Sequence, residues 1–297
     1  MSITELIAEI TKVLPQIGAA PESRITRMPP VSGGCISTAH IVETSDQKYF
    51  VKSHTADSFM TKQMCKSMFE AELHGLNALR HTHTIRVPQP LHVGDLSSGA
   101  FLILEYIPLT RLRDHHKLGH QLAYLHLFEG PSQFGFDTNN YIGSTMQPNG
   151  WHDTWVDLLQ ERLQYQFDCA QFTGHMKNMA DKLIRRLTQF FKGLDIRPSL
   201  VHGDLWAGNC AADSSGEPVV FDPAVYWGHH EAELSIMRMF GGFTLDFYDA
   251  YHERIPRAPG FELRAQIYEL YHTVNHYNMF GSGYLDQCQR LLERILQ

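Results

Sequence analysis

The chain reads His202-Gly203-Asp204-Leu205-Trp206-Ala207-Gly208-Asn209 and, after a short interval, Phe221-Asp222-Pro223. Asp204 and Asn209 stand five residues apart, and Asp222 lies thirteen residues beyond Asn209, at the end of a predicted strand. Each of these residue types often caps a turn when it occurs alone. As an ordered set of two carboxylates and one amide between predicted helices, they indicate a functional site.

The spacing of these three residues favours phosphoryl transfer. In the catalytic loop of protein kinases, H-R-D-L-x-x-x-N, the Asp-to-Asn interval is the same, and a second Asp after a strand holds magnesium. A carboxylate such as Asp204 can accept the proton of a substrate hydroxyl, whereas Asn209 and Asp222 offer the hard oxygen ligands that Mg²⁺ prefers. We therefore predict Asp204 as the catalytic base and Asn209 and Asp222 as metal ligands, with ATP and Mg²⁺ as cofactors. His202 is expected to hold the loop through a hydrogen bond.

The N-terminal part of the chain is predicted to supply the nucleotide site. Gly33 and Gly34 lie in a strand-turn-strand pattern whose backbone N–H groups can approach phosphate oxygens, and Cys35 belongs to the same loop. Lys52, on the strand after next, can reach the α- and β-phosphates. Glu72, on the following helix, is expected to pair with Lys52 and fix its position.

A hydrophobic strand near Phe101 to Tyr106 leads into the expected connection between two lobes. Backbone groups of Glu105, Tyr106 and Ile107 are predicted to contact the edge of adenine. Alternate side chains of the same strand can at the same time belong to the core.

The order of elements predicts an α+β, protein-kinase-like fold of two lobes. Residues 1–107 form a small N-terminal lobe with a five-stranded antiparallel sheet and one packed helix over Phe59 to Arg80. Residues 108–297 form a large, mainly helical C-terminal lobe that carries the catalytic loop. Ahead of the sheet, Met1 to Leu14 is expected to be an amphipathic helix that Pro15 ends.

Composition excludes several classes of protein. Of the 297 residues, 43% are apolar and 19% charged, which is typical of a globular chain with a buried core. The formal charge of −7 provides no basic field for nucleic acid or an anionic bilayer, and no apolar run approaches the ~20 residues of a membrane span. Neither partner is expected. Five cysteines without C-x-x-C spacing, and no pattern of a secretory signal, favour a reducing cytoplasmic location.

The chain contains 18 histidines. His272 and His276 stand four residues apart, as metal ligands on one helix face do, but the H-E-x-x-H glutamate and an obvious third ligand are missing. The adjacent pairs His115-His116 and His229-His230 are expected at the surface. A histidine-based metallohydrolase is therefore the least favoured functional class.

From about Val31 to Leu285 the chain resembles the fructosamine kinase (ketosamine-3-kinase) family, a branch of the kinase-like fold close to aminoglycoside and choline phosphotransferases. The motifs that carry the resemblance are Ser32-Gly33-Gly34-Cys35-Ile36-Ser37, Phe50-Val51-Lys52, Phe69-x-x-Glu72-x-x-Gly75-Leu76, Phe134-Gly135-Phe136, Asn140-x-Ile142-Gly143, Trp151 with Trp155, the segment from His202 to Asn209, Asp222-Pro223-Ala224, Phe240-Gly241-Gly242-Phe243, and Leu270-Tyr271-His272 through Asn275-His276 to Phe280-Gly281.

The resemblance implies ATP- and Mg²⁺-dependent phosphorylation of the 3-hydroxyl of ketosamines, the adducts of sugars with amines, by a site in residues 108–297. The phosphate destabilises the adduct and regenerates the amine of a small molecule or a protein, which is deglycation. Trp206 separates this family from aminoglycoside kinases; its ring can pack on sugar C–H groups, or it can be a buried plug of the loop. One departure is His230, where many members have Arg before the Glu that Glu231 matches.

Several members of the family carry a cysteine in the phosphate loop that links two subunits. The resemblance thus implies a homodimer through Cys35 under oxidation, with a small loop filler as the alternative. Two other functions stay open: a small-molecule kinase of the aminoglycoside or choline phosphotransferase type, and a non-catalytic nucleotide-binding redox module. Polycationic antibiotics are mildly disfavoured, because the stretch from Pro223 to Gln297 has only nine acidic against six basic residues.

Overall fold

The computed structural model describes residues 2–31, 37–58 and 60–297. The first part of the chain forms, in order, α1 (Ile3–Val13), the 3₁₀ helix η1 (Leu14–Ile17), β1 (Ile25–Arg27), β2 (Pro30–Val31), β3 (Thr38–Thr44), β4 (Lys48–Thr55), α2 (Lys62–His81), β5 (Pro90–Leu96) and β6 (Gly99–Glu105).

The strands of this part build one antiparallel sheet in the order β1-β3-β4-β6-β5, with β2 also pairing with β3. The prediction of five strands is therefore wrong, because the sheet has six among the described residues. The missed strand, β1, has only three residues and an irregular register with β3, so it shows no usable alternation. Lys52 lies within β4, opposite Leu102 of β6.

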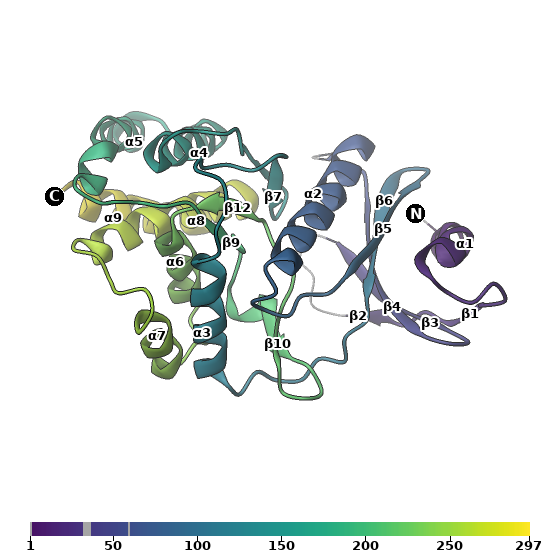
Figure 1. The fold of residues 1–297 in the computed structure, drawn as a ribbon. Coiled ribbons are helices and arrows are strands. Elements are labelled where there is room, and N and C mark those ends of the chain that lie inside the picture. The colour runs from purple at the N-terminus through teal and green to yellow at the C-terminus, as the bar shows by residue number, and fades with distance from the viewer. Residues whose placement is uncertain (1, 32–36, 59) are drawn as a thin grey trace.

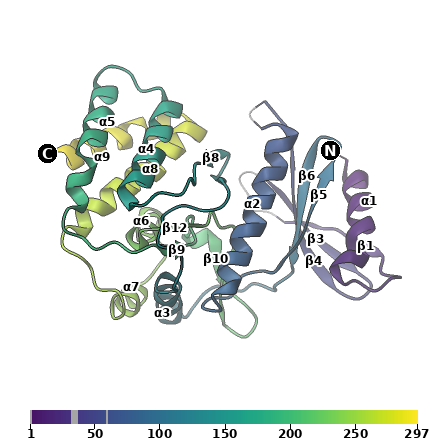
Figure 2. The same cartoon turned by 45° about the horizontal axis from the view of Figure 1, so that its top comes forward.

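Each face of the sheet is covered by a helix, α1 on one side and α2 on the other (Figures 1 and 2). Along β6, Phe101 and Ile103 pack in the cluster that contains Leu6 and Ile10 of α1. Ala100, Leu102 and Leu104, which alternate with these two residues and point to the other face, pack in the cluster that contains Phe69 and Leu76 of α2. Burial on both faces explains why β6 is apolar without interruption. The expectation of a single packed helix is thus wrong.

Both predicted helices of this part exist with corrected ends. Thr61 caps α2, and its hydroxyl accepts the backbone N–H of Met64 at 3.2 Å, so the helix begins after the expected Phe59. Pro15 follows the end of the α-helix, but the chain continues as the 3₁₀ helix η1. Pro15 occupies the first turn of η1, where its missing N–H would have had no partner.

The rest of the chain is mainly helical. Its elements are α3 (His115–His126), β7 (Asn140–Ile142), β8 (Thr145–Gln147), α4 (Trp155–Ala170), α5 (Gly174–Arg186), η2 (Leu187–Phe191), β9 (Ser199–Val201), η3 (Ala207–Asn209), β10 (Cys210–Ala212), β11 (Pro218–Val220), β12 (Tyr226–Gly228), α6 (His230–Phe240), α7 (Leu245–His252), α8 (Phe261–Phe280), η4 (Ser282–Tyr284) and α9 (Leu285–Leu296). The α+β fold class is confirmed. In the described parts of the chain, no helix is both long and apolar enough to span a bilayer.

Short strands carry the predicted catalytic segment. The strands β9 and β11, which lie on either side of it, do not pair with each other. Instead β9 pairs with β12, and β11 pairs with β10, both antiparallel. The hairpin β10-β11 connects Asn209 to Asp222 and so returns the chain to the catalytic loop.

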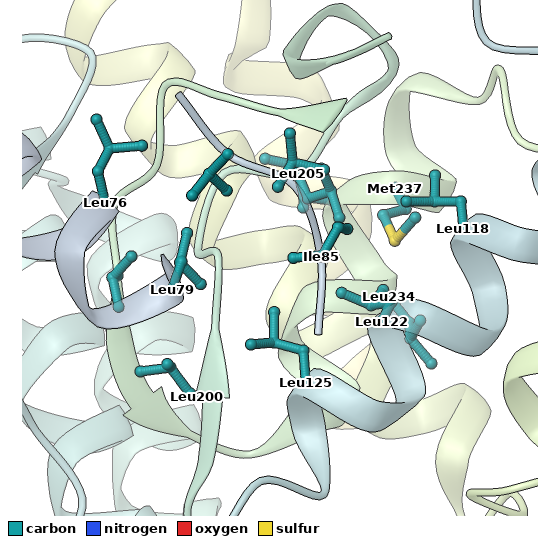
Figure 3. Packing of buried hydrophobic residues seen from close by; sticks show 14 of the residues in the cluster. Leu76, Leu79, Ile85, Leu118, Leu122, Leu125, Leu200, Leu205, Leu234 and Met237 are labelled. Atoms are coloured by element: carbon teal, nitrogen blue, oxygen red, sulfur yellow. The ribbon is translucent and has the colours of Figure 1, made fainter. Parts of the chain in front are cut away.

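One hydrophobic core joins the sheet to the helices. Figure 3 shows Leu76 and Leu79 of α2 on one side of this cluster, and on the other Leu234 and Met237 of α6 beside Leu122 and Leu118 of α3. Leu205, the residue after Asp204, is fully buried in the same cluster. The packing therefore fixes α2 and the catalytic loop to a common core.

Candidate active site

A buried lysine links the sheet, α2 and the segment after β11. Lys52 Nζ lies 2.5 Å from Glu72 Oε1 and 2.5 Å from Asp222 Oδ1. The side chains of Lys52 and Glu72 are 10% and 12% exposed, whereas that of Asp222 is 44% exposed. The structure thus brings together three of the predicted site residues, with Asp222 open to solvent.

The charge of Lys52 is maintained by its partners. Burial acts to lower the pKa of Lys52, but the carboxylates of Asp222 and then Glu72 outweigh it and raise this pKa. Lys52 therefore stays an ammonium group at all physiological pH values, which suits it to bind phosphate oxygens.

Asn209 connects the predicted base, Asp204, with the other predicted metal ligand, Asp222. Its Nδ2 donates to the backbone carbonyl of Asp204 at 2.8 Å and to Asp204 Oδ2 at 3.1 Å. It also lies 3.5 Å from the backbone carbonyl of Asp222. Asp222 itself has a left-handed backbone conformation, with φ of 59°, which is uncommon outside glycine and is tolerated by aspartate.

The Asp204 carboxyl lies in a strongly acidic environment. Burial, followed by the negative charges of Asp222 and Glu233, raises the pKa of Asp204 well above its usual value. A raised pKa makes a carboxylate a stronger base, which is what proton abstraction from a hydroxyl requires.

The oxygen atoms of this cluster suit a hard divalent cation. Asp222 supplies carboxylate oxygens and Asn209 an amide oxygen, which are donors that Mg²⁺ accepts, and the carboxyl of Asp204 is linked to Asn209 beside them. The ammonium of Lys52 faces more carboxylates than it can neutralise, so additional positive charge is favoured there.

The backbone before Asp204 permits only glycine. Gly203 has φ of +83°, and a Cβ on it would lie 2.1 Å from the carbonyl oxygen of Ala224. The backbone N–H of Ala224 in turn donates to the carbonyl of His202 at 2.8 Å. The catalytic loop and the segment after Asp222 are therefore packed backbone against backbone.

The buried His202 holds the loop, in the manner expected from the sequence. Its Nε2 lies 3.0 Å from the carbonyl of Phe221, and the backbone N–H of Asp204 donates to its Nδ1 at 3.3 Å. Since a carbonyl only accepts, the ring proton belongs on Nε2 and Nδ1 is free to accept. Burial lowers the pKa of His202, which favours this neutral form.

Sequence reasoning missed Glu233 of α6, whose side chain is fully buried. Its carboxylate accepts the backbone N–H of His202 at 2.5 Å and that of Gly203 at 3.1 Å. Burial acts to raise the pKa of Glu233, but the nearby His126 ring, with Nε2 3.7 Å from Oε2, and the backbone N–H of Gly203 lower it overall. The available signal was an acidic residue between the apolar Ala232 and Leu234, two positions after another acidic residue, Glu231.

The predicted adenine contact lies at the end of β6. The side chain of Glu105 pairs with Arg86, and its backbone N–H donates to the carbonyl of Gln89 at 2.8 Å. That N–H is therefore occupied. Among the described residues, the backbone N–H of Ile107 has no hydrogen-bond acceptor. The residues Tyr106 and Ile107 are both half-buried.

Trp206 lies at the surface beside Asp204. Trp206 is 36% exposed, so it is not a buried plug of the loop. A Cβ on Gly208 would lie 2.1 Å from the outer edge of the Trp206 ring, so the ring packs directly on the backbone of Gly208. The ring also contacts Phe240, with centroids 5.6 Å apart, and Phe240 contacts His276 at 5.4 Å. These side chains form an aromatic surface that extends from the catalytic loop to α8.

The remaining predicted residues have different outcomes. Gly33, Gly34 and Cys35 lie outside the described residues. His276 Nδ1 lies 2.7 Å from the backbone carbonyl of His272, so these two rings do not share a ligand through that nitrogen.

The expectation that the His229-His230 pair is exposed is wrong. His229 is 4% exposed, and its Nδ1 lies 2.7 Å from the hydroxyl of Tyr268. His230 contacts the hydroxyl of Tyr251 at 3.1 Å, and burial lowers the pKa of His230 to about 3. Side chains from α3, α7 and α8 cover the start of α6 and bury this pair, which local sequence does not reveal.

Comparison with known proteins agrees with this geometry. The model of the fructosamine kinase family matches residues 7–297. The chain belongs to the fructosamine kinase family. It is 41% identical to the probable ketoamine kinase slr1563 of Synechocystis, over 92% of this chain and 92% of that protein. It is 39% identical to the ketosamine-3-kinase of Mus musculus, over 89% and 93% of the two chains.

Solved structures support the same family fold. A crystal structure assigned as a fructosamine-3-kinase from Haemophilus somnus has a TM-score of 0.86 at 26% identity, covering 98% of this chain and 97% of its own. A more distant aminoglycoside phosphotransferase, APH(4)-Ia, has a TM-score of 0.64 at 14% identity, over 99% and 97% of the chains, and shares the fold alone. The family resemblance and the protein-kinase-like fold predicted from the motifs are confirmed.

Proposed function

We propose that this protein is a kinase that uses ATP and Mg²⁺ to phosphorylate the 3-hydroxyl of ketosamines. The observation that carries the proposal is the contact of Lys52 with both Glu72 and Asp222, next to the linked pair Asp204 and Asn209. Membership of the fructosamine kinase family supports the substrate class, and the name of the mouse relative supports the 3-position.

The roles of the polar residues follow from their surroundings. Glu72 and Asp222 take two of the three N–H donors of Lys52, so one donor is free for a phosphate oxygen, and a second is released when Asp222 turns to Mg²⁺. Asp204 orients the substrate hydroxyl and accepts its proton. Asn209 and Asp222 hold Mg²⁺, which when bound neutralises charge that develops on the transferred phosphoryl group.

The two parts of the chain divide the substrates between them. Residues 1–107 bind the nucleotide, and residues 108–297 bind the ketosamine. The proposed nucleotide-binding residues are Gly33, Gly34, Cys35, Lys52, Glu72, Glu105, Tyr106 and Ile107. In the segment from Glu105 to Ile107, the backbone N–H of Ile107 is the group that meets the adenine edge, because the N–H of Glu105 already donates to the carbonyl of Gln89.

The exposed ring of Trp206 forms the wall on which the sugar packs. Its position two residues after Asp204 brings an apolar face to the C–H groups beside the reacting hydroxyl. Phe240 supports that ring from α6. Phosphorylation then destabilises the adduct, and the amine of a small molecule or of a protein is released.

We also propose a cytoplasmic location and a homodimer through Cys35 under oxidation. Four cysteines in the described residues are free thiols, which fits a reducing compartment. A non-reducing gel of peroxide-treated protein tests the dimer. A dimer that persists in Cys35→Ser contradicts it.

The decisive experiment is a phosphorylation screen with ribulosyl- and fructosyl-amines, an aminoglycoside and choline as acceptors, with Asp204→Ala as control. Wild type is expected to phosphorylate the ketosamines. Asp204→Ala is expected to keep its fold and nucleotide affinity while turnover falls by about 10²- to 10⁴-fold, the contribution of a general base. Transfer to the antibiotic or choline alone, or unchanged turnover in the variant, contradicts the proposal.

A further inference from the structure

A second cluster of potential metal ligands lies on the helical part of the protein, between α3 and the end of α7. It consists of His116, His120 and Glu253, one ligand atom of each lying within 4.8 Å of the other two. None of these residues belongs to the cluster around Lys52. The proposed kinase reaction leaves all three without a role.

Helix geometry brings the two histidines together. His116 and His120 are four residues apart on α3, so they share one face of the helix. Their ring centroids are 4.6 Å apart, and the rings are inclined at 72°. The neighbouring His115 points elsewhere and contacts Phe243. The pair is therefore a local property of α3.

Close packing of two helices supplies the third ligand. Gly119 lies between the two histidines, and a Cβ on it would be 2.3 Å from the carbonyl of Phe247 on α7. Only glycine allows this approach. It places Glu253, which caps α7, with Oε2 3.6 Å from His120 Nε2. The cation of Arg254 also covers the ring of Tyr124 on α3 at 4.4 Å, which holds the end of α7 in place.

We propose that His116, His120 and Glu253 bind a divalent transition-metal ion of the Zn²⁺ class, as a clamp between α3 and α7. Two imidazoles and one carboxylate form a set that Zn²⁺ accepts, with water in the fourth position, whereas Mg²⁺ prefers oxygen ligands alone. In a tetrahedral site the ligand atoms are about 3.3 Å apart. The His120–Glu253 separation is already close to this value. His116 and Glu253 are exposed, so their side chains can close the remaining distance by rotation.

The test is Zn²⁺ binding by untagged, nucleotide-free protein, measured in competition with a colorimetric chelator. Wild type is expected to bind one equivalent, with no competition from millimolar Mg²⁺. Mutation of a residue that only hydrogen-bonds to a metal ligand typically lowers metal affinity by about 10- to 100-fold. Removal of a ligand itself, in His116→Ala or Glu253→Gln, should therefore weaken Zn²⁺ binding at least about tenfold. The matched control, His175→Ala, removes an exposed helix histidine outside the cluster and should bind as wild type does.

Exposure of His116 and Glu253 means that both variants should fold, which circular dichroism checks. Anomalous scattering from a zinc-soaked crystal gives an independent readout, with the expected peak between the three side chains. Absence of saturable binding by wild type, equal affinity in wild type and both variants, or a peak elsewhere overturns the proposal. None of these readouts depends on kinase activity, so failure here is distinct from failure of the proposed function.

Discussion

Two buried ionic sites in this protein differ in how well their charges balance. In the helical core, Glu231 of α6 and Arg264 of α8 form two hydrogen bonds of 2.7 Å each, and both side chains are at most 2% exposed. The guanidinium also donates to the carbonyl of Pro259 at 2.7 Å. One cation meets one anion, and the site is closed.

The site around Lys52 is built differently. Its ammonium contacts Glu72 and Asp222, Asp204 lies close enough for their charges to interact, and Asp222 is open to solvent. Negative charge is in excess. A closed pair holds helices together, whereas an open cluster with unbalanced charge is arranged to receive a cation. Variants of the Glu231–Arg264 pair should lose stability, whereas variants of the site around Lys52 should lose activity.

The largest effect is expected for Asp222→Asn. The amide removes the charge that Lys52 and a metal ion require, so turnover should fall by at least about 10⁴-fold, beyond the 10²- to 10⁴-fold of a general base. The free energy of unfolding should not decrease, since the variant relieves excess negative charge. Kinetics and urea denaturation provide the two measurements.

Asp195→Asn, at a side chain that is 84% exposed, is the control for that variant and should match wild type. A stability loss with retained turnover in Asp222→Asn would assign the site around Lys52 to the same structural role as the core pair.

Next in size is Arg264→Met in the core pair. It leaves the buried Glu231 carboxylate without its partner, which should lower the free energy of unfolding by about 3–5 kcal/mol. The kcat of the folded fraction should stay near that of wild type. Urea denaturation measures the loss, with Arg197→Met, at an 87% exposed side chain, as control.

The double variant Glu231→Gln/Arg264→Met sharpens this result. It removes the unpaired charge and should recover part of the lost stability. A single variant as stable as wild type would show that the core pair contributes no more than a surface pair.

A smaller effect is expected for Glu233→Gln, which tests the support of the catalytic loop. A glutamine cannot accept both the His202 and the Gly203 N–H with charged oxygens, and such bonds are worth about 1.5–3 kcal/mol. We expect kcat to fall about 10- to 100-fold while KM for ATP changes much less, which identifies a positioning residue.

Steady-state kinetics with varied ATP measure this separation, and Glu293→Gln, at an exposed site, is the control. Equal changes in kcat and KM, or none, would contradict the assigned role of Glu233.

The smallest effect is a gain in stability for Asp204→Asn. Because the pKa of Asp204 is raised, the native protein keeps a proton between about pH 4 and its own higher pKa, a range in which the unfolded chain has released that proton. Wild-type stability therefore falls as pH rises between the unfolded and native pKa values, and the variant avoids this loss.

Thermal unfolding across a pH series should show Asp204→Asn above wild type at pH 7, with the gap closing below the ordinary pKa of aspartate. A variant less stable than wild type at pH 7 would show that the Asp204 carboxylate stabilises the fold, as the core pair does.

The sequence predicted the fold class because its signals were local. Alternation and helical spacing located most strands of the sheet and α2, and the fixed intervals among Asp204, Asn209 and Asp222 indicated phosphoryl transfer. The first strand fails this test: β1 has three residues with irregular pairing, too few to show a period. The second sheet helix, α1, was located, but its packing on β6 was not foreseen.

The amino-acid sequence by itself determined the kind of chemistry, since the loop residues stand at intervals set by the local chain. Tertiary structure alone decided their partners. Lys52 meets Asp222 across 170 residues, and Glu233 reaches the loop backbone from α6. Such contacts depend on how helices and strands pack. No spacing along the chain encodes that packing, because burial and partner choice follow from the whole core rather than from neighbours in sequence.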